Sequence, residues 1–287
     1  GLTVDQKLAH RKAVDDIAVS WEQAFSMGAE MAFEDDRRKI LALLSEVATK
    51  ARENAETTDW AAYALIVGEY LKEQSPERWI EIFTPLVAGV ITDQGYRWAS
   101  TIGLPFDPIT IQASPWFDDY MVTFAQPIND TTREIVGNII DQGMNEGWSV
   151  ETMSNHIGTT FDQFMRGDVT PEEFAWYDER MPPYRLEMIS RTETIRASNA
   201  GATEVFDQMG VQQKEWLSTP DGRTRIAHQV GAAWGQPPLV VDQDKPFIIG
   251  GEPLMFPGDP AGSPENTIQC RCTVIPVVDK TLEGMDG

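Results

Sequence analysis

The sequence predicts an α+β protein, with a mostly helical amino-terminal region followed by a small α+β module that carries a short, turn-rich sheet. Through most of the first 209 residues, apolar side chains recur at helical spacing. After Gly210, β-branched runs alternate with turns rich in Gly and Pro, which is typical of short strands. We therefore expect an acidic helical region over residues 1–128 and the α+β module over residues 129–287.

The amino-terminal region is predicted to hold several helices. Residues 4–55 have helical spacing, interrupted by the charged run Glu34–Lys39, which we expect to face solvent. Residues 59–74 predict a second helix that stops before Pro76, where a third begins. Residues 103–127 contain four prolines and predict an irregular crossing. This crossing is expected to dock through Trp116, Phe117 and Tyr120.

The carboxy-terminal module is predicted to begin with helices and to end in strands. Residues 131–144 have helical spacing, and a long helix is expected over about residues 183–209, ended by Gly210. The strands are expected between residues 211 and 278. They comprise residues 211–217, two short strands around Gly250 and Gly251, and residues 273–278.

The charge of the chain is strongly negative and unevenly distributed. Residues 1–179 contribute −18 of the formal net charge of −22, and residues 180–287 only −4. Binding to DNA phosphates or to an anionic membrane relies on Lys and Arg, so this balance favours neither contact. We find no stretch apolar enough to span a bilayer and no signal-peptide pattern. Two cysteines are too few for a disulfide framework, so we expect folding in a reducing compartment.

One group of residues has the chemistry of zinc ligands. His228, Cys270 and Cys272 offer an imidazole and two thiolates, three of the four ligands of a tetrahedral structural site. Cysteines one residue apart on a strand point to opposite faces, however. We therefore expect both thiols to be small buried side chains of a strand, with no metal and no cofactor. Zinc held by these three residues is the alternative.

The run of residues 216–228 gathers an acid, two guanidiniums and an imidazole. Asp221 and His228 could form an acid–base pair. We find no nucleophile in a recognisable setting and no phosphate-binding loop to accompany them. We expect instead a turn in which Arg223, Arg225 and His228 hold neighbouring carbonyl and carboxylate groups, and no catalytic residue.

Several motifs resemble one family in their order as well as their residues. The run Ile189–Gly201 resembles the "ARTE…A.N.G" helix of the phage Mu F-like head morphogenesis family. Other motifs extend the resemblance to about residues 130–280. They are Gly147-Trp148-Ser149, Gly210-Val211, Lys214-Glu215-Trp216, Asp221-Gly222-Arg223-Thr224-Arg225, His228, residues 247–254, Pro257–Pro260, and residues 264–272 with Cys270-Arg271-Cys272.

The resemblance implies a phage minor head protein. Such proteins are structural components of the virion or prohead, associated with the portal vertex and assisting head assembly, DNA packaging or ejection. The implied partners are the portal protein and other head proteins, with several copies per particle in the phage head and assembly in the host cytoplasm. The implied chain is not an enzyme. Two alternatives stay open: a hydrolase- or transferase-like enzyme using His228, and the carboxy-terminal part of a portal fusion polypeptide, because Gly1 is not preceded by a methionine.

The same motifs predict a structural seam within the module. We expect one face of the long helix, bearing Arg191, Glu193, Arg196 and Asn199, to pack against residues 221–228, because partly buried guanidinium–carboxylate pairs fix register. The seam as a whole comprises Arg191, Glu193, Arg196, Asn199, Trp216, Asp221, Arg223, Arg225, His228, Cys270, Arg271 and Cys272.

Overall fold

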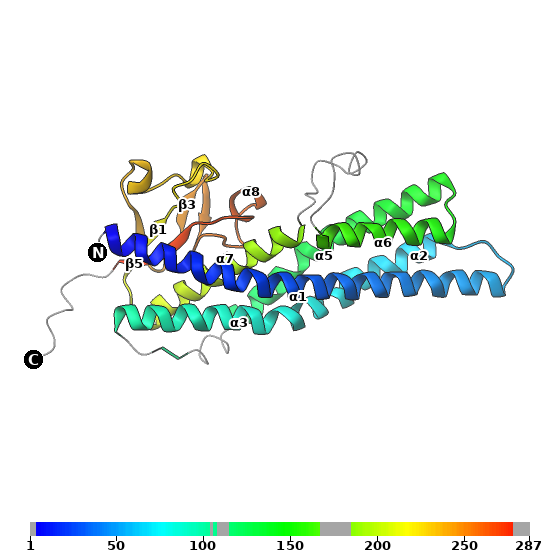
Figure 1. Ribbon diagram of the computed structural model, residues 1–287, viewed down its shortest axis with the longest axis horizontal. Helices are drawn as coiled ribbons and strands as arrows, with labels where there is room; N and C mark the ends of the chain where they lie inside the picture. Colours follow the sequence, from blue (N-terminus) through cyan, green and yellow to red (C-terminus); the bar gives the residue numbers. More distant parts are fainter. Residues whose placement is uncertain (1–3, 104–105, 108–114, 167–184, 278–287) are drawn as a thin grey trace, which may run out of the picture. The chain divides into compact units, whose positions relative to one another are not determined.

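The structure, a computed structural model, describes residues 4–103, 106–107, 115–166 and 185–277 (Figure 1). Long helices precede a small antiparallel sheet, which confirms the predicted α+β class. The longer helices are α1 (Val4–Glu53), α2 (Trp60–Glu69), α3 (Ser75–Ile102), α5 (Pro115–Glu146), α6 (Val150–Arg166) and α7 (Arg185–Gln208). The strands are β1 (Gln213–Leu217), β2 (Leu239–Asp242), β3 (Phe247–Ile249), β4 (Glu252–Leu254) and β5 (Thr273–Val277). Short helical segments are η1 (Tyr70–Gln74), η2 (Ile226–His228), η3 (Ala232–Trp234) and α8 (Pro264–Thr267).

The chain forms two compact units, each assembled from segments that are far apart in the sequence. Unit 1 comprises Gly1–Phe25, Pro85–Phe117 and Ser190–Gly287, and unit 2 comprises Ser26–Thr84 and Asp118–Ile189. These units do not follow the division that we expected between residues 128 and 129. The reason is that α1 and α3 are long enough to contribute one part to each unit, so a boundary in space falls inside a helix. Within the described ranges, no helix combines the length and apolar character needed to cross a membrane.

The helix predicted over residues 59–74 does not stop before Pro76. Helix α2 passes through the π-helical turn η1 into α3, and Ser75 at the junction keeps helical angles. The backbone N–H of Ser75 donates to the carbonyl of Tyr70, five residues earlier. Proline has no N–H to offer the normal helical ladder. A wider turn directly ahead of Pro76 lets the chain continue as a helix with a changed hydrogen-bond register.

The prediction of an irregular crossing over residues 103–127 is wrong for the second half of this range. Helix α5 begins at Pro115, a residue type well suited to the first position of a helix. Phe117 and Tyr120 are buried on this helix, at helical spacing with the buried Phe124. Pro127 lies inside α5 and is exposed. Residues 104–105 and 108–114, and the side chain of Trp116, lie outside the described part of the chain.

Asp36, which we expected in a solvated charge cluster, is fully buried in unit 2. It shares one face of α1 with Phe33 and Ile40, so the apolar face continues through the charged run instead of being interrupted by it. The hydroxyl of Tyr70 donates to one carboxylate oxygen at 2.7 Å, and the indole N–H of Trp79 donates to the other at 3.1 Å. Burial raises the pKa of Asp36, and these hydrogen bonds counter the rise only in part.

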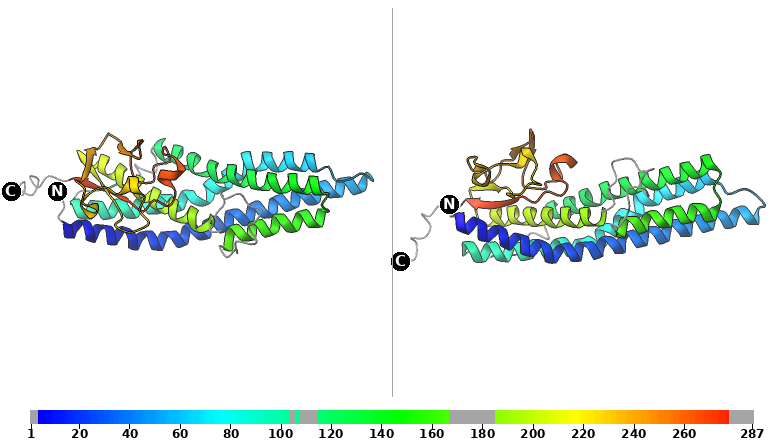
Figure 2. Two further views of the ribbon diagram at one scale, coloured as in Figure 1. Left: turned by 90° about the horizontal axis from the view of Figure 1, so that it is seen from above. Right: turned by 45° about the horizontal axis from the view of Figure 1, so that its top comes forward.

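In unit 1 the three-stranded sheet has the order β2-β1-β5, and both strand pairs are antiparallel. Trp216 of β1 lies opposite Leu239 of β2 and Val274 of β5. A separate hairpin pairs β3 with β4 around Gly250 and Gly251. Their φ values of 60° and 85° lie in the left-handed region that favours glycine. The predicted Gly-Gly turn is therefore confirmed, and the right view of Figure 2 shows β5 alongside α7.

Candidate functional site

Asn199 is the centre of the contacts between α7 and the sheet. Its side chain is 1% exposed and makes four hydrogen bonds. The amide nitrogen donates to the carbonyls of Pro257 and Cys272, each at 3.0 Å. The amide oxygen accepts from the hydroxyl of Thr273 and the backbone N–H of Val274, each at 3.0 Å. These four bonds use the whole capacity of the amide.

The other family-like residues of α7 also bind within unit 1. Arg196 donates from Nε to the carbonyl of Gly258 at 2.8 Å and from Nη1 to Glu193 at 2.6 Å. Both charged side chains of that pair are largely buried, at 11% and 6% exposure. Arg191 instead contacts Glu22 of α1 at 3.4 Å. The bond from Arg196 to Gly258 fixes the loop after β4 on the helix, and Arg191 ties the helix to α1.

The segment of residues 221–228 is held by the turn that precedes β5. Asp221 forms an ion pair with Arg271 at 2.6 Å. Arg225 donates to the carbonyl of Ile268. Arg223 is exposed and lies 3.8 Å from Asp221. We expected this segment to pack against the α7 face; the hydrogen bonds described for Arg196 and Asn199 of that face go to residues 257–258 and 272–274.

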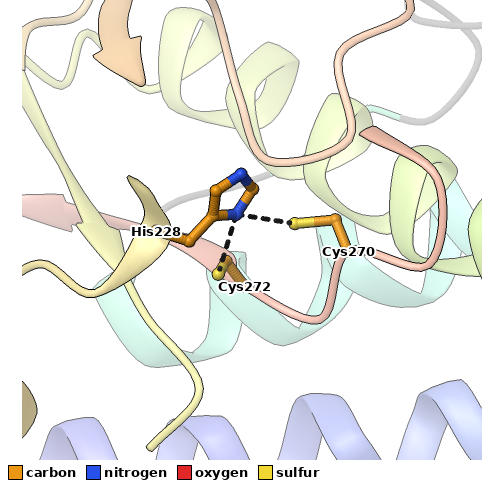
Figure 3. Close-up of side chains that lie close together, drawn as sticks. All are labelled: His228, Cys270 and Cys272. Carbon is orange, nitrogen blue, oxygen red and sulfur yellow. Dashed lines mark hydrogen bonds between the residues drawn. The ribbon is translucent and has the colours of Figure 1, made fainter. Parts of the chain in front are cut away.

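His228, Cys270 and Cys272 form a buried cluster, shown in Figure 3. Their exposed fractions are 1%, 2% and 2%. Both sulfur atoms point to the same ring nitrogen: Nδ1 of His228 lies 3.6 Å from Sγ of Cys270 and 3.7 Å from Sγ of Cys272. The ring of Trp216 stands edge-on to the imidazole, with centroids 5.4 Å apart. An imidazole and two thiols are ligand types that zinc prefers.

The two cysteines do not lie on a strand, so the expectation that they face opposite ways is wrong. They precede β5, which begins at Thr273. Gln269 has a φ of 54°, a left-handed conformation that is uncommon for a residue with a side chain. Its backbone N–H donates to the hydroxyl of Thr192 at 3.0 Å. Sequence reasoning missed both Gln269 and Thr192, because neither residue type signals such a turn.

The thiols of the cluster are electrostatically unequal. The hydrogen bond from Cys270 lowers the pKa of Cys272 well below its ordinary value; burial opposes this shift, and the nearby His228 adds to it. Cys270 donates this hydrogen bond to Cys272 and is also buried, and both effects raise the pKa of Cys270. The cluster therefore favours a thiolate at Cys272, the form that binds metals.

The match to a known protein family covers most of the motifs described above. Residues 134–275 match the family described as phage Mu protein F like protein. This segment belongs to the phage Mu F-like family. The resemblance that the motifs carried is thereby confirmed, and the F-like segment runs from α5 through α6 and α7 into β5.

A curated relative of the chain is an uncharacterized protein, YqbB, of Bacillus subtilis (strain 168). It is 23% identical over 185 residues, which cover 63% of this chain and 54% of the relative. The chain thus spans about half the length of this relative. No solved structure matches the chain.

The enzyme alternative for the F-like segment required His228 to work with an acid. The imidazole is instead buried, and the contacts of its Nδ1 are the two sulfur atoms. Asp221, the acid considered for this role, is paired with Arg271. The geometry therefore favours a structural or ligand-holding role for His228 over general base catalysis.

Replacing Asp221 tests how the F-like segment is held together. Burial acts against ionisation, but the hydrogen bond from Arg271 prevails and lowers the pKa of Asp221. The contribution of this pair is therefore present above the ordinary pKa and lost as the pH falls through the lowered value. Because the pair is partly exposed, we expect Asp221→Asn to reduce the free energy of unfolding at neutral pH by about 1 kcal/mol. Urea denaturation measures this loss.

The matched control is Asp244→Asn, which removes an exposed carboxylate paired with Lys245. It should leave the free energy of unfolding unchanged. Equal effects of the two substitutions would contradict a structural role for the pair of Asp221 and Arg271.

Lys214 is a buried cation that the sequence did not reveal as such. It is fully buried in β1, donates to the carbonyl of Met255 at 2.9 Å, and lies 5.5 Å from the centroid of the Phe247 ring. Burial lowers its pKa to about 8, although nearby carboxylates, led by that of Asp207, oppose this shift.

The lowered pKa of Lys214 predicts a rise in stability with pH. Between about pH 8 and the ordinary value of 10.5, the unfolded chain binds more protons at this site than the folded chain does. The free energy of unfolding should therefore increase across this window by about 2 kcal/mol relative to Lys214→Met, which has no group to titrate. Urea titrations of both proteins at several pH values measure the difference. Lys245→Met, at an exposed lysine, is the control, and a wild-type slope no steeper than that of Lys214→Met would contradict the prediction.

Proposed function

We propose that this chain is a minor head protein of a tailed phage, a structural component of the prohead and virion bound at the portal vertex. In this proposal it assists capsid assembly or DNA packaging and ejection, with the portal protein and other head proteins as partners. The observation that carries the proposal is the match of residues 134–275 to the phage Mu F-like family.

The contacts of the motif residues support a structural role for the chain. All four hydrogen bonds that the side chain of Asn199 can form are made within the protein. Arg196 binds the carbonyl of Gly258 and the carboxylate of Glu193. The ion pair of Asp221 with Arg271 is likewise internal. Side chains committed to such contacts hold a shape. The family-like pattern is therefore best explained by the need to build a fixed surface.

The charge of the chain favours protein partners over DNA. Acidic side chains exceed basic ones by 22. Glu53, Glu56 and Asp59 are exposed around the connection between α1 and α2. Such groups repel the phosphate backbone, whose binding depends on Lys and Arg. We therefore propose that the acidic helices contact other head proteins, in several copies around the portal.

The proposal is tested in the phage or prophage that encodes the chain. A tagged copy should co-purify with proheads, mature heads and portal protein, and electron microscopy of the particle should place it on the portal ring. Deleting its gene should reduce the yield of infectious particles. Particles that form and infect normally without the chain would refute a role in head assembly.

Two matched variants connect the structure to this test. Asn199→Ala removes the central contacts of unit 1 and should prevent incorporation into heads. Asn138→Ala changes an exposed asparagine of α5 and should be incorporated normally. A further variant, His228→Gln, separates the alternatives: an enzyme would lose its activity while remaining in the particle. Incorporation of a destabilised Asn199→Ala chain at the wild-type level would argue against the folded module as the binding surface.

A further inference from the structure

We propose that His228, Cys270 and Cys272 form a zinc-binding site, with Nδ1 of the imidazole and the two thiolates as ligands. These three ligand atoms lie within 4.8 Å of one another, and all three residues are buried. The site goes beyond the proposed role in the phage head and does not depend on it, because metal binding is a property of the isolated chain.

The distances fit a metal at the centre of the cluster. Zinc bonds to sulfur are about 2.3 Å and those to histidine nitrogen about 2.0–2.1 Å, so a tetrahedral angle between them separates nitrogen from sulfur by about 3.6 Å. The two nitrogen–sulfur separations are 3.6 Å and 3.7 Å. The protein therefore holds the imidazole nitrogen and each sulfur at the separation that a tetrahedral zinc ion requires.

Hydrogen bonds alone leave this arrangement incompletely satisfied. A neutral imidazole nitrogen has either one lone pair or one N–H, and so forms one good hydrogen bond. Nδ1 of His228 faces two sulfur atoms at nearly equal distance. A cation that accepts electron pairs from Nδ1 and from both thiolates satisfies all three ligand atoms at once.

The surroundings hold the ligands in place before any metal binds. The carbonyl of Cys272 accepts a hydrogen bond from Asn199 at 3.0 Å, and the backbone N–H of Cys270 donates to Thr267 at 3.3 Å. The edge of Trp216 packs against the imidazole. Such outer contacts orient ligands and raise metal affinity. The cluster contributes three ligands within the described part of the chain, and we assign the fourth position to a water molecule.

A zinc ion here would join two segments of unit 1 that are distant in sequence. His228 ends η2, and the two cysteines precede β5. Loop closure of this kind stabilises a fold when the ligands come together only in the folded state. Binding would release the thiol protons to solvent.

The first experiment measures metal content. The full chain, purified without chelators and with zinc in the growth medium, should contain about one equivalent of zinc by mass spectrometry of the elements. Cys272→Ser and His228→Gln should each lower the content at least tenfold. His156→Gln is the matched control, because that histidine lies on α6 and stacks on Trp148 instead of facing sulfur. It should retain the wild-type content.

The second experiment uses the wild-type chain alone, so it stands even if the variants do not fold. Cobalt added to the chelator-treated protein should give a thiolate-to-metal charge-transfer band that stoichiometric zinc removes. A strong chelator should lower the melting temperature, and zinc should restore it. Zinc should slow the alkylation of both thiols relative to the zinc-free protein. The proposal would be overturned if the reduced protein bound neither zinc nor cobalt. It would also be overturned if Cys270 and Cys272 formed a disulfide, or if copper were the metal found in the purified protein.

Discussion

An Asn199→Ala variant is expected to lose about 3–4 kcal/mol of unfolding free energy, because the substitution leaves several buried polar groups without partners. The carbonyls of Pro257 and Cys272 and the backbone N–H of Val274 each lose a hydrogen bond of 3.0 Å. Each unsatisfied buried group costs about 1–3 kcal/mol, and entering water can relieve part of this cost. Chemical denaturation measures the total.

Hydrogen exchange shows where the loss falls. The amides of β1 and β5 should exchange faster in Asn199→Ala, because β5 is tied to α7 through this side chain. The control is Asn138→Ala, on the exposed side of α5, which should leave these amides protected. Unchanged protection of β5 in the Asn199 variant would show that the sheet holds its place without this amide.

The second large effect is expected from Gly201→Leu. A Cβ added at Gly201 would lie 3.0 Å from the Cα and 3.0 Å from the Cγ1 of Ile91. A backbone atom moves only if α3 and α7 separate within unit 1. Ala197, one turn earlier on the same face of α7, is also small and buried. Overpacking at such a contact costs typically about 1–3 kcal/mol, and we expect about 3 kcal/mol because backbone must shift.

The control for Gly201→Leu is Gly137→Leu. Gly137 also lies within a helix, α5, but a Cβ there would meet no atom within 4 Å. Replacing a helical glycine without a clash should stabilise the protein by about 0.5–1 kcal/mol. The two substitutions should therefore shift the melting temperature in opposite directions. A stabilising effect at both positions would mean that the α3–α7 crossing is more open than described.

Periodicity predicted the elements of this fold better than their packing. The apolar spacing of the long helix around residues 183–209 and the Gly250-Gly251 turn led directly to α7 and to the β3–β4 hairpin. Asp36 shows the limit, because the helical spacing places it on the buried face while its charge suggests solvent. Only the partners supplied by Tyr70 and Trp79, from another part of the chain, decide between the two.

The candidate site was predictable in its residues and not in its geometry. Chemistry alone selected His228, Cys270 and Cys272. The alternation rule for strands then argued against shared ligation, and it failed because the two cysteines precede β5. Gln269 adopts a left-handed conformation that glutamine rarely takes, so no sequence pattern predicts this turn.

The interleaved construction of unit 1 has a consequence for the timing of folding during synthesis. Lys7 of α1 pairs with Glu215 of β1 at 2.6 Å, and Arg11 donates to the carbonyl of Ser218 at 2.8 Å. At translation rates of about 5–20 residues per second, the start of α1 emerges roughly 10–40 s before these partners do. Unit 1 therefore closes only when β5 has left the ribosome, whereas unit 2 has all its segments by Ile189. Newly made protein should consequently acquire its sheet-bearing surface last, and a chain interrupted before β5 should lack it.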